Sequence, residues 1–150
     1  MTYILGERSG GCFFCEGSAG DDDRGSLILY RGERCFIIMN RFPYNNGHLL
    51  VAPYRHVGNM EDLKQDESLD LMKLLQASIV ALREELGPDG FNVGINIGKT
   101  GGAGVVDHIH LHIVPRWNGD TNFMPVLSQT KIISEALEKT YDKLWNAFHP

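Results

Sequence analysis

The chain has 150 residues, a formal net charge of −5 and a pI near 5.6. Its hydrophobic and charged fractions, 43% and 22%, are ordinary for a soluble globular domain that buries a core without disulfide bonds. The negative charge argues against general binding to nucleic acid or anionic membranes, although local donors can still hold a nucleotide-sized anion.

The three cysteines, Cys12, Cys15 and Cys35, indicate the redox environment. No apolar run approaches the roughly 20 residues of a membrane helix. The first residues lack a basic stretch followed by an apolar core, so no signal peptide is expected. An odd, low cysteine count without a secretion signal indicates a reducing cytoplasm with free or metal-bound thiols. Cys35 lies in an apolar run and is expected to be a buried core thiol.

The first elements expected along the chain are a loop and three strands. The polar segment 15–25 predicts a surface loop. Two short apolar runs, 27–30 and 35–39, are separated by a turn-like segment and predict a hairpin. Residues 48–52 predict a third strand, which Pro53 ends.

The hydrophobic period changes over residues 66–86. Apolar residues recur there every three to four positions, which predicts a long amphipathic helix. Asp66 or Ser68 is expected to cap its start, and Gly87, followed by proline, to end it.

Two strands and a helix complete the expected order. Residues 91–98 alternate apolar with small or polar residues and predict a strand, and 106–114 predict a last strand stopped by Pro115. The glycine-rich segment 99–104 between them predicts a flexible or phosphate-binding loop. Helical spacing predicts a C-terminal helix over about residues 130–148. This order predicts an α+β domain on a mostly antiparallel sheet.

Three histidines recur at every second position of the last predicted strand. Because side chains alternate across a strand, His108, His110 and His112 would share one face, and the apolar residues between them would pack on the long helix. Such a row of imidazoles could chelate a metal, or one imidazole could act as a nucleophile beside a bound phosphate. No Glu follows to complete a metal site, and the glycines just before the row offer backbone N–H groups to an anion. These features favour the nucleophile.

Residues 107–117, with the pattern His-φ-His-φ-His-φ-φ, resemble the signature of the histidine triad (HIT) family. Segments 40–56 and 91–98 resemble two further blocks of that family, and the match covers roughly residues 12–126. The resemblance implies one HIT domain over residues 1–150. It also implies a five-stranded antiparallel sheet with one long packed helix and a C-terminal helix, and assembly as a homodimer.

The resemblance assigns roles to four histidines. In the family the middle histidine attacks the α-phosphorus of a nucleotide and becomes a nucleotidyl-histidine, and His110 holds that position here. His112 would hold phosphate oxygens or protonate the leaving group. His48 would complete the catalytic cluster with His108.

Substrate contacts are expected at five further positions. The resemblance places the ribose region at Asn40 and a site-lining amide at Asn96. The loop before the triad offers Lys99, Gly104 and Val105 to phosphate groups. The base is expected in an apolar cleft of early residues such as Phe13, Phe36 or Ile38.

Cys12 and Cys15 have the spacing of half a zinc site, although two unrelated cysteines would show the same spacing. In related proteins with Cys-x-x-Cys, one further ligand comes from the Pro-x-x-His position and another from the first histidine of the triad. The resemblance therefore implies a structural zinc held by Cys12, Cys15, His56 and His108, which would tie the N-terminal segment 1–25 to the catalytic strand.

The resemblance implies a nucleotidyl transferase or hydrolase that cleaves dinucleoside polyphosphates, such as diadenosine tetraphosphate, with phosphate or water as acceptor. A nucleoside phosphoramidase, a non-catalytic nucleotide-binding module and a metalloenzyme with its metal on the triad are the alternatives. The hydrolase branch carries Gln where Gly104 stands, and residues 115–123 resemble the diadenosine tetraphosphate phosphorylase branch. Phosphate is therefore the favoured acceptor, with Lys99 and Arg116 as candidate donors.

Overall fold

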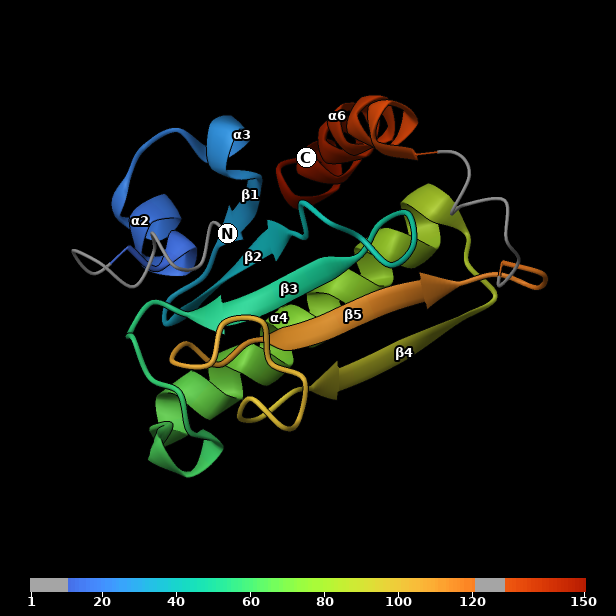
Figure 1. The fold of residues 1–150 in the computed structure, drawn as a ribbon. Coiled ribbons are helices and arrows are strands. Elements are labelled where there is room, and N and C mark those ends of the chain that lie inside the picture. Colours follow the sequence, from blue (N-terminus) through green and yellow to red (C-terminus); the bar gives the residue numbers. More distant parts are fainter. Residues whose placement is uncertain (1–10, 121–128) are drawn as a thin grey trace.

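The computed structural model describes residues 11–120 and 129–150 of the chain. Its centre is a five-stranded antiparallel sheet in the order β1-β2-β3-β5-β4, as Figure 1 shows. The predicted α+β architecture and antiparallel sheet are confirmed, whereas residues 1–10 of the predicted zinc-binding segment lie outside the described residues. The strands are β1 (Ile28–Arg31), β2 (Cys35–Met39), β3 (Leu49–Pro53), β4 (Gly90–Ile95) and β5 (Leu111–Arg116), and the helices are α2 (Phe13–Ala19), α3 (Asp23–Ser26), the 3-10 helix η2 (Met60–Asp62), α4 (Gln65–Leu86) and α6 (Gln129–Phe148).

The long helix α4 covers one face of the sheet and packs on β2, β3 and β5 (Figure 1). It ends at Gly87, which adopts the left-handed conformation (φ 59°) that glycine tolerates best. Its start differs from the prediction, because Lys64 and not Asp66 or Ser68 holds the cap position. The Glu67 carboxylate accepts a hydrogen bond from the Lys64 backbone N–H at 2.8 Å and so satisfies that terminal donor.

The segment predicted as a surface loop contains the helices α2 and α3. Their carbonyl and carboxylate oxygens converge on Arg31, whose guanidinium donates to the carbonyls of Ser18 (2.6 Å) and Gly20 (2.9 Å) and to the Asp23 carboxylate (2.8 Å). A cation at the end of a helix satisfies carbonyls that lack helical partners. The prediction was wrong because this order comes from a distant side chain, which local composition does not reveal.

Both strands that flank the glycine-rich loop are shorter than predicted. β4 ends at Ile95, and Gly98 turns the chain with a φ of 73°. β5 begins only at Leu111, because the Ile109 N–H donates to the Val57 carbonyl at 2.7 Å instead of joining the sheet ladder.

β5 continues through Pro115 to Arg116, so proline does not stop the strand as predicted. The pairing of β5 with β3 ends at Ile113, and beyond it β5 pairs only with β4, where Pro115 lies opposite Phe91. Proline lacks an N–H, and it is tolerated where a neighbouring strand is absent on one side.

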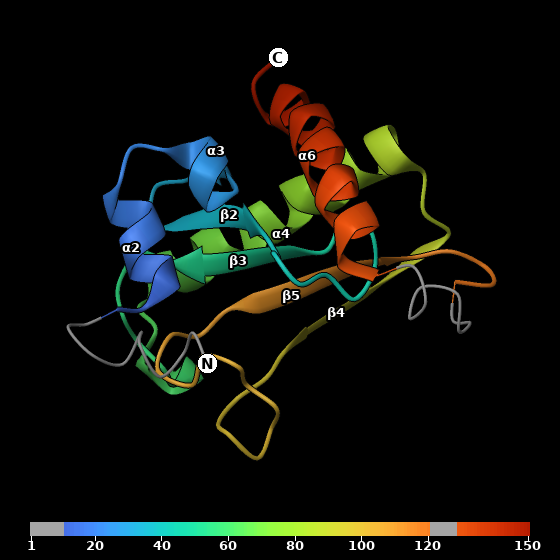
Figure 2. The same ribbon diagram turned by 45° about the horizontal axis from the view of Figure 1, so that its top comes forward.

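The C-terminal helix α6 contacts β1 and α4, and Figure 2 shows it between α3 and the C-terminal end of α4. Tyr141 anchors it, since its hydroxyl donates to the Ile28 carbonyl at 2.8 Å and its ring is buried. Within the described part of the chain, no helix has both the length and the apolar character that crossing a membrane requires.

Candidate active site and metal-binding cluster

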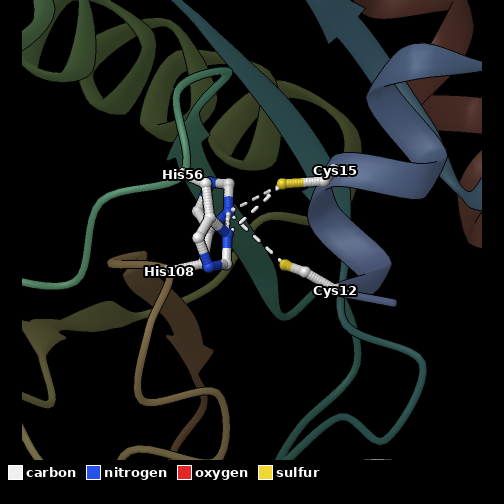
Figure 3. Close-up of side chains that lie close together, drawn as sticks. All are labelled: Cys12, Cys15, His56 and His108. Atoms are coloured by element: carbon white, nitrogen blue, oxygen red, sulfur yellow. Dashed lines mark hydrogen bonds between the residues drawn. The ribbon is translucent and has the colours of Figure 1, made fainter. Parts of the chain in front are cut away.

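Two cysteines and two histidines from three distant segments converge in one cluster (Figure 3). Cys12 and Cys15 lie at the start of α2, His56 follows β3, and His108 precedes β5. The Nδ1 atoms of the histidines are 3.2 Å apart, and the sulfur atoms approach an Nδ1 atom at 3.4 to 3.5 Å. Tetrahedral zinc with ordinary Zn–N and Zn–S bonds separates its ligands by about 3.3 Å (N to N) and 3.6 Å (S to N). The cluster has a geometry suited to one tetrahedral ion.

The orientation of His108 suits a metal ligand. Its ring is fully buried, and its Nε2 lies 2.7 Å from the Pro53 carbonyl oxygen. A carbonyl can only accept, so Nε2 carries the proton and Nδ1, which faces both thiols, has the free lone pair. A backbone acceptor that fixes the tautomer in this way is usual for metal-binding histidines.

Phe14 connects this cluster to His110. It lies between the two cysteines in the sequence and is fully buried. Its ring centroid is 5.1 Å from that of His108 and 4.9 Å from that of His110. The helix that carries the thiols therefore also forms one wall around His110. This role of Phe14 could not be predicted from the sequence, because a phenylalanine inside Cys-x-x-Cys looks like any other apolar residue.

His110 has one ring nitrogen bound and one available. Its Nδ1 donates to the His108 carbonyl oxygen at 2.9 Å, so Nε2 carries the lone pair. No described residue donates to Nε2. His110 as a whole is 5% exposed. Burial lowers the pKa of His110 below its ordinary value.

His48 and His112 form a directed pair. The Tyr44 backbone N–H donates to Nδ1 of His48 at 3.1 Å, so the proton of His48 is on Nε2. That nitrogen lies 2.9 Å from Nδ1 of His112 and donates to it. His112 is left with its proton on Nε2, as a hydrogen-bond donor on the side away from His48. Its ring centroid is 4.9 Å from that of His110.

Both rings of this pair are held neutral. Burial, and next the imidazoles of His112 and His110, lower the pKa of His48 to about 3. Burial and then His110 lower the pKa of His112 to about 4. A charge on any one of three adjacent, poorly hydrated imidazoles is costly. At pH 7 the site presents a lone pair at His110 and a neutral donor at His112.

A pocket of about 410 Å³ opens beside His112, over β4 and β5. Asn96 is one of the residues that line it, and so is Tyr44, which was not anticipated. The Tyr44 ring, 68% exposed, lies nearly parallel to that of His112 at 5.9 Å. The proline and the Asn-Asn-Gly turn before His48 were the sequence features that could have predicted a tight loop beside the site. Asn45, Arg116 and Asp120 also line the pocket.

The sequence of this chain matches a known protein family. The family model described as "HIT domain" matches residues 23–119. The chain belongs to the HIT family. The match begins after the two cysteines, so the helix α2 that carries them lies outside the matched region of this HIT domain.

Relatives of this HIT domain carry nucleotide-related names. An AP-4-A phosphorylase of Mycobacterium tuberculosis is 42% identical over 118 residues, which are 79% of this chain and 60% of that protein, so the chain spans about three-fifths of that relative. A bis(5'-adenosyl)-triphosphatase of Dictyostelium discoideum is 37% identical over 93 residues, 62% of each. The solved structure of a Zn-bound histidine triad family protein from Mycobacterium smegmatis shares the fold with a TM-score of 0.65 and 29% identity, over 93% of this chain and 99% of that one.

The predicted ribose contact of the HIT domain, Asn40, lies beside His48. Its Oδ1 accepts from the Phe42 N–H at 2.9 Å, and its Nδ2 lies 3.4 Å from Nδ1 of His48. Asn40 therefore also orders the loop that carries His48. The apolar base cleft differs from the prediction: Phe13 is 41% exposed, but Phe36 and Ile38 belong to the core with at most 2% exposed. The alternation of side chains along β2 could not distinguish cleft residues from core residues, because every residue of β2 is buried.

The glycine-rich loop of the HIT domain uses part of its backbone internally. The Gly102 N–H donates to the Lys99 carbonyl, and the Ala103 N–H to the Gly98 carbonyl. Lys99 and Gly104 are exposed, and Val105 packs against the core. Among the described contacts, none joins the predicted contacts Lys99, Gly104 or Val105 to His110 or His112.

Arg116, a candidate hydrogen-bond donor to phosphate, is engaged within the protein. Its Nε and Nη2 donate to both carboxylate oxygens of Asp120 at 2.8 and 2.9 Å, and its Nη1 donates to Asn92 at 2.6 Å. The ion pair lines the pocket with its charge already compensated.

Proposed function

We propose that this HIT protein cleaves dinucleoside polyphosphates through a nucleotidyl intermediate on His110. The observation that carries the proposal is the direction of the hydrogen bonds. The hydrogen bond from His110 Nδ1 to the His108 carbonyl leaves a lone pair on Nε2, and His112 presents an N–H donor on the ring beside it. A positioned nucleophile next to a donor for phosphate oxygens is what nucleotidyl transfer needs. The names of the two curated relatives support this substrate class.

The reaction would run in two displacements on the α-phosphorus. First, the lone pair of His110 Nε2 forms a P–N bond, and the P–O bond to the rest of the polyphosphate breaks. The departing oxygen takes the electron pair and accepts a hydrogen bond from His112 Nε2–H. Then phosphate or water attacks the same phosphorus, the P–N bond breaks, and its electron pair returns to Nε2.

We favour phosphate as the acceptor of the second step. A Gln in the hydrolase branch corresponds to Gly104, which is exposed here and has no side chain to fill the space of that Gln. The M. tuberculosis relative is named a phosphorylase, whereas the D. discoideum relative is named a triphosphatase. Backbone N–H groups of the glycine-rich loop that are not used internally would bind the second anion.

Product analysis tests the function and the acceptor together. Diadenosine tetraphosphate is incubated with the protein, with and without millimolar phosphate. Phosphate-dependent formation of ADP and ATP is expected. Phosphate-independent AMP and ATP would identify a hydrolase. No turnover beside rapid cleavage of an adenosine phosphoramidate would identify a phosphoramidase, and nucleotide binding without any turnover would identify a non-catalytic module.

We further propose that the cluster of Cys12, Cys15, His56 and His108 holds a structural zinc. Four protein ligands leave no open position for water or substrate. The ligand separations and the Zn-bound M. smegmatis relative support this assignment. Bound there, zinc would supply no chemistry to the reaction but would fix α2, and with it Phe14, against His110.

A homodimer completes the proposal. The strand β4 lies at an edge of the sheet, and α4 exposes a stripe of apolar side chains. Exposed edges and apolar helix faces are features that proteins usually cover. The stripe consists of Leu69, Met72 and Val80, which are 58%, 51% and 54% exposed.

A further inference from the structure

A carboxylate outside the histidine cluster lies at the end of a hydrogen-bond chain that leads into it. Asp120, four residues beyond the end of β5, accepts four hydrogen bonds through its two oxygens. Two come from Arg116, one from the Trp117 N–H at 3.0 Å, and one from Asn45 Nδ2 at 2.6 Å. These donors, Arg116 first, hold the pKa of Asp120 far below its usual range. The carboxylate is thus a permanent, fixed acceptor at neutral pH.

Asn45 links the Asp120 carboxylate to the loop that carries His48. Its Nδ2 also donates to the Pro115 carbonyl at 3.0 Å, so the amide is tied to β5 as well as to Asp120. Its own carbonyl accepts from the His48 N–H at 3.2 Å. One residue before Asn45, the backbone N–H of Tyr44 donates to Nδ1 of His48. The side chain of Asn45 therefore fixes the turn that presents this N–H.

Two donors in this loop, the Tyr44 N–H at 3.1 Å and the more distant Asn40 Nδ2 at 3.4 Å, keep Nδ1 of His48 an acceptor and so determine which nitrogen of His112 carries a proton. A backbone N–H can only donate, so Nδ1 of His48 must accept, and the two imidazoles can be protonated only on Nε2. Asn40 is tied to the same loop through the Phe42 N–H, so if the turn relaxed and both donors moved away, Nδ1 of His48 could take the proton. His112 could then be protonated on Nδ1, and its Nε2 would face the substrate as a lone pair. A lone pair repels phosphate oxygens, whereas an N–H binds them.

We propose that Asp120, held by Arg116, is a positioning residue that acts through Asn45 and the Tyr44 N–H to keep the proton of His112 on Nε2. Its importance for turnover rests on the proposed function, but its effect on the tautomer does not. The pair Arg116–Asp120 lines the pocket beside His112, and none of its described hydrogen bonds is made directly to a histidine. The ion pair would thereby ensure that the departing phosphate oxygen meets an N–H donor on Nε2 of His112.

The tautomer of His112 can be read directly from the nitrogen chemical shifts of its ring by NMR, without substrate, at pH 7. The variants are Asp120→Ala and Asn45→Ala, which each remove one partner of the hydrogen bond between Asn45 and Asp120. The matched control is Asp142→Ala, which removes another aspartate–arginine pair, that with Arg24, far from this turn in sequence. Melting temperatures are recorded for all of them.

The wild type and Asp142→Ala are expected to show His112 protonated on Nε2. Both other variants are expected to show a clear share of Nδ1 protonation, with kcat lowered about tenfold, as for the loss of one oriented hydrogen bond. If Asp120→Ala fails to fold, Asn45→Ala carries the test. An unchanged tautomer in a folded Asn45→Ala variant would overturn the inference. A wild type without turnover would instead count against the proposed function, because the tautomer is measured without substrate.

Discussion

At the scale of single residues, the direction of each hydrogen bond separates the roles of chemically identical histidines. His108 directs its Nδ1 to the thiols, because its Nε2 donates to Pro53. His110 has the opposite arrangement, with Nδ1 donating to a carbonyl and the lone pair on Nε2. His112 receives its tautomer from His48. Neutral imidazole has one donor and one acceptor, so a single fixed partner determines the chemistry of the other nitrogen.

His110→Ala is expected to lower turnover by roughly a thousandfold or more, because covalent catalysis requires its nucleophile. The measurement is kcat for cleavage of diadenosine tetraphosphate, together with the mass of acid-quenched protein, which should show one added nucleotidyl group in the wild type only. His149→Ala, an exposed histidine stacked on Trp145, is the control and should keep both. Near-normal activity of His110→Ala would refute the mechanism.

The burial of His48 predicts acid sensitivity. Its pKa is about 3 in the folded chain and about 6.5 when unfolded, so below pH 6.5 the unfolded chain binds more protons. The contribution to stability is complete above pH 6.5 and falls by about 1.4 kcal/mol per pH unit as the pH decreases towards 4. Urea unfolding at a series of pH values should therefore show a shallower pH dependence for His48→Gln than for the wild type. Equal slopes would mean that His48 titrates normally in the folded protein.

At the scale of elements, α2 depends on what it binds. It has seven residues and buries only Phe14 and Gly17, too little for a helix of this length to be stable alone. Its C-terminal carbonyls are held by Arg31, and its N-terminal thiols face His56 and His108. We therefore expect metal binding to determine whether α2 stays packed on His110.

One zinc per chain is expected in protein purified without an affinity tag. Chelation should lower the melting temperature, because metal binding contributes directly to folding free energy. Cys15→Ala should lose the zinc. Cys35→Ala should retain it, since Cys35 is fully buried in the core, where burial, and next nearby carboxylates, raise the pKa of its thiol to about 12. A metal-free wild type of undiminished stability would exclude the zinc site.

At the scale of the whole molecule, the core is enclosed between the sheet and α4, but the outer surface of α4 carries the exposed stripe of Leu69, Met72 and Val80. We expect two copies to associate through this surface and the β4 edge, as a symmetric interface would bury both. Light scattering at micromolar concentration should give twice the chain mass. Met72→Lys, in the exposed stripe, should shift the mass towards one chain, whereas Met60→Lys, 43% exposed on η2, should not. A single-chain mass for the wild type would contradict the proposed dimer.

Much of this architecture could be predicted from the sequence, because it depends on short-range patterns. The run 35–39, the amphipathic period of 66–86 and the glycine after it correspond closely to β2, α4 and its end. The row of histidines, together with the family resemblance, also predicted the metal set, since the four residue types and spacings are recognisable along the chain. Periodicity and turn residues act over a few positions and leave a trace in local sequence.

The tertiary structure alone decided which atoms of those residues are available. Asn45 meets Asp120 across 75 positions, Phe14 covers His110, and Arg31 orders a segment whose composition predicted a loop. Local sequence determines which side chains share a face, but not which distant carbonyl or N–H each will meet. Since the proton of a neutral imidazole follows its fixed partner, the division of labour among these histidines is settled only when the chain has folded.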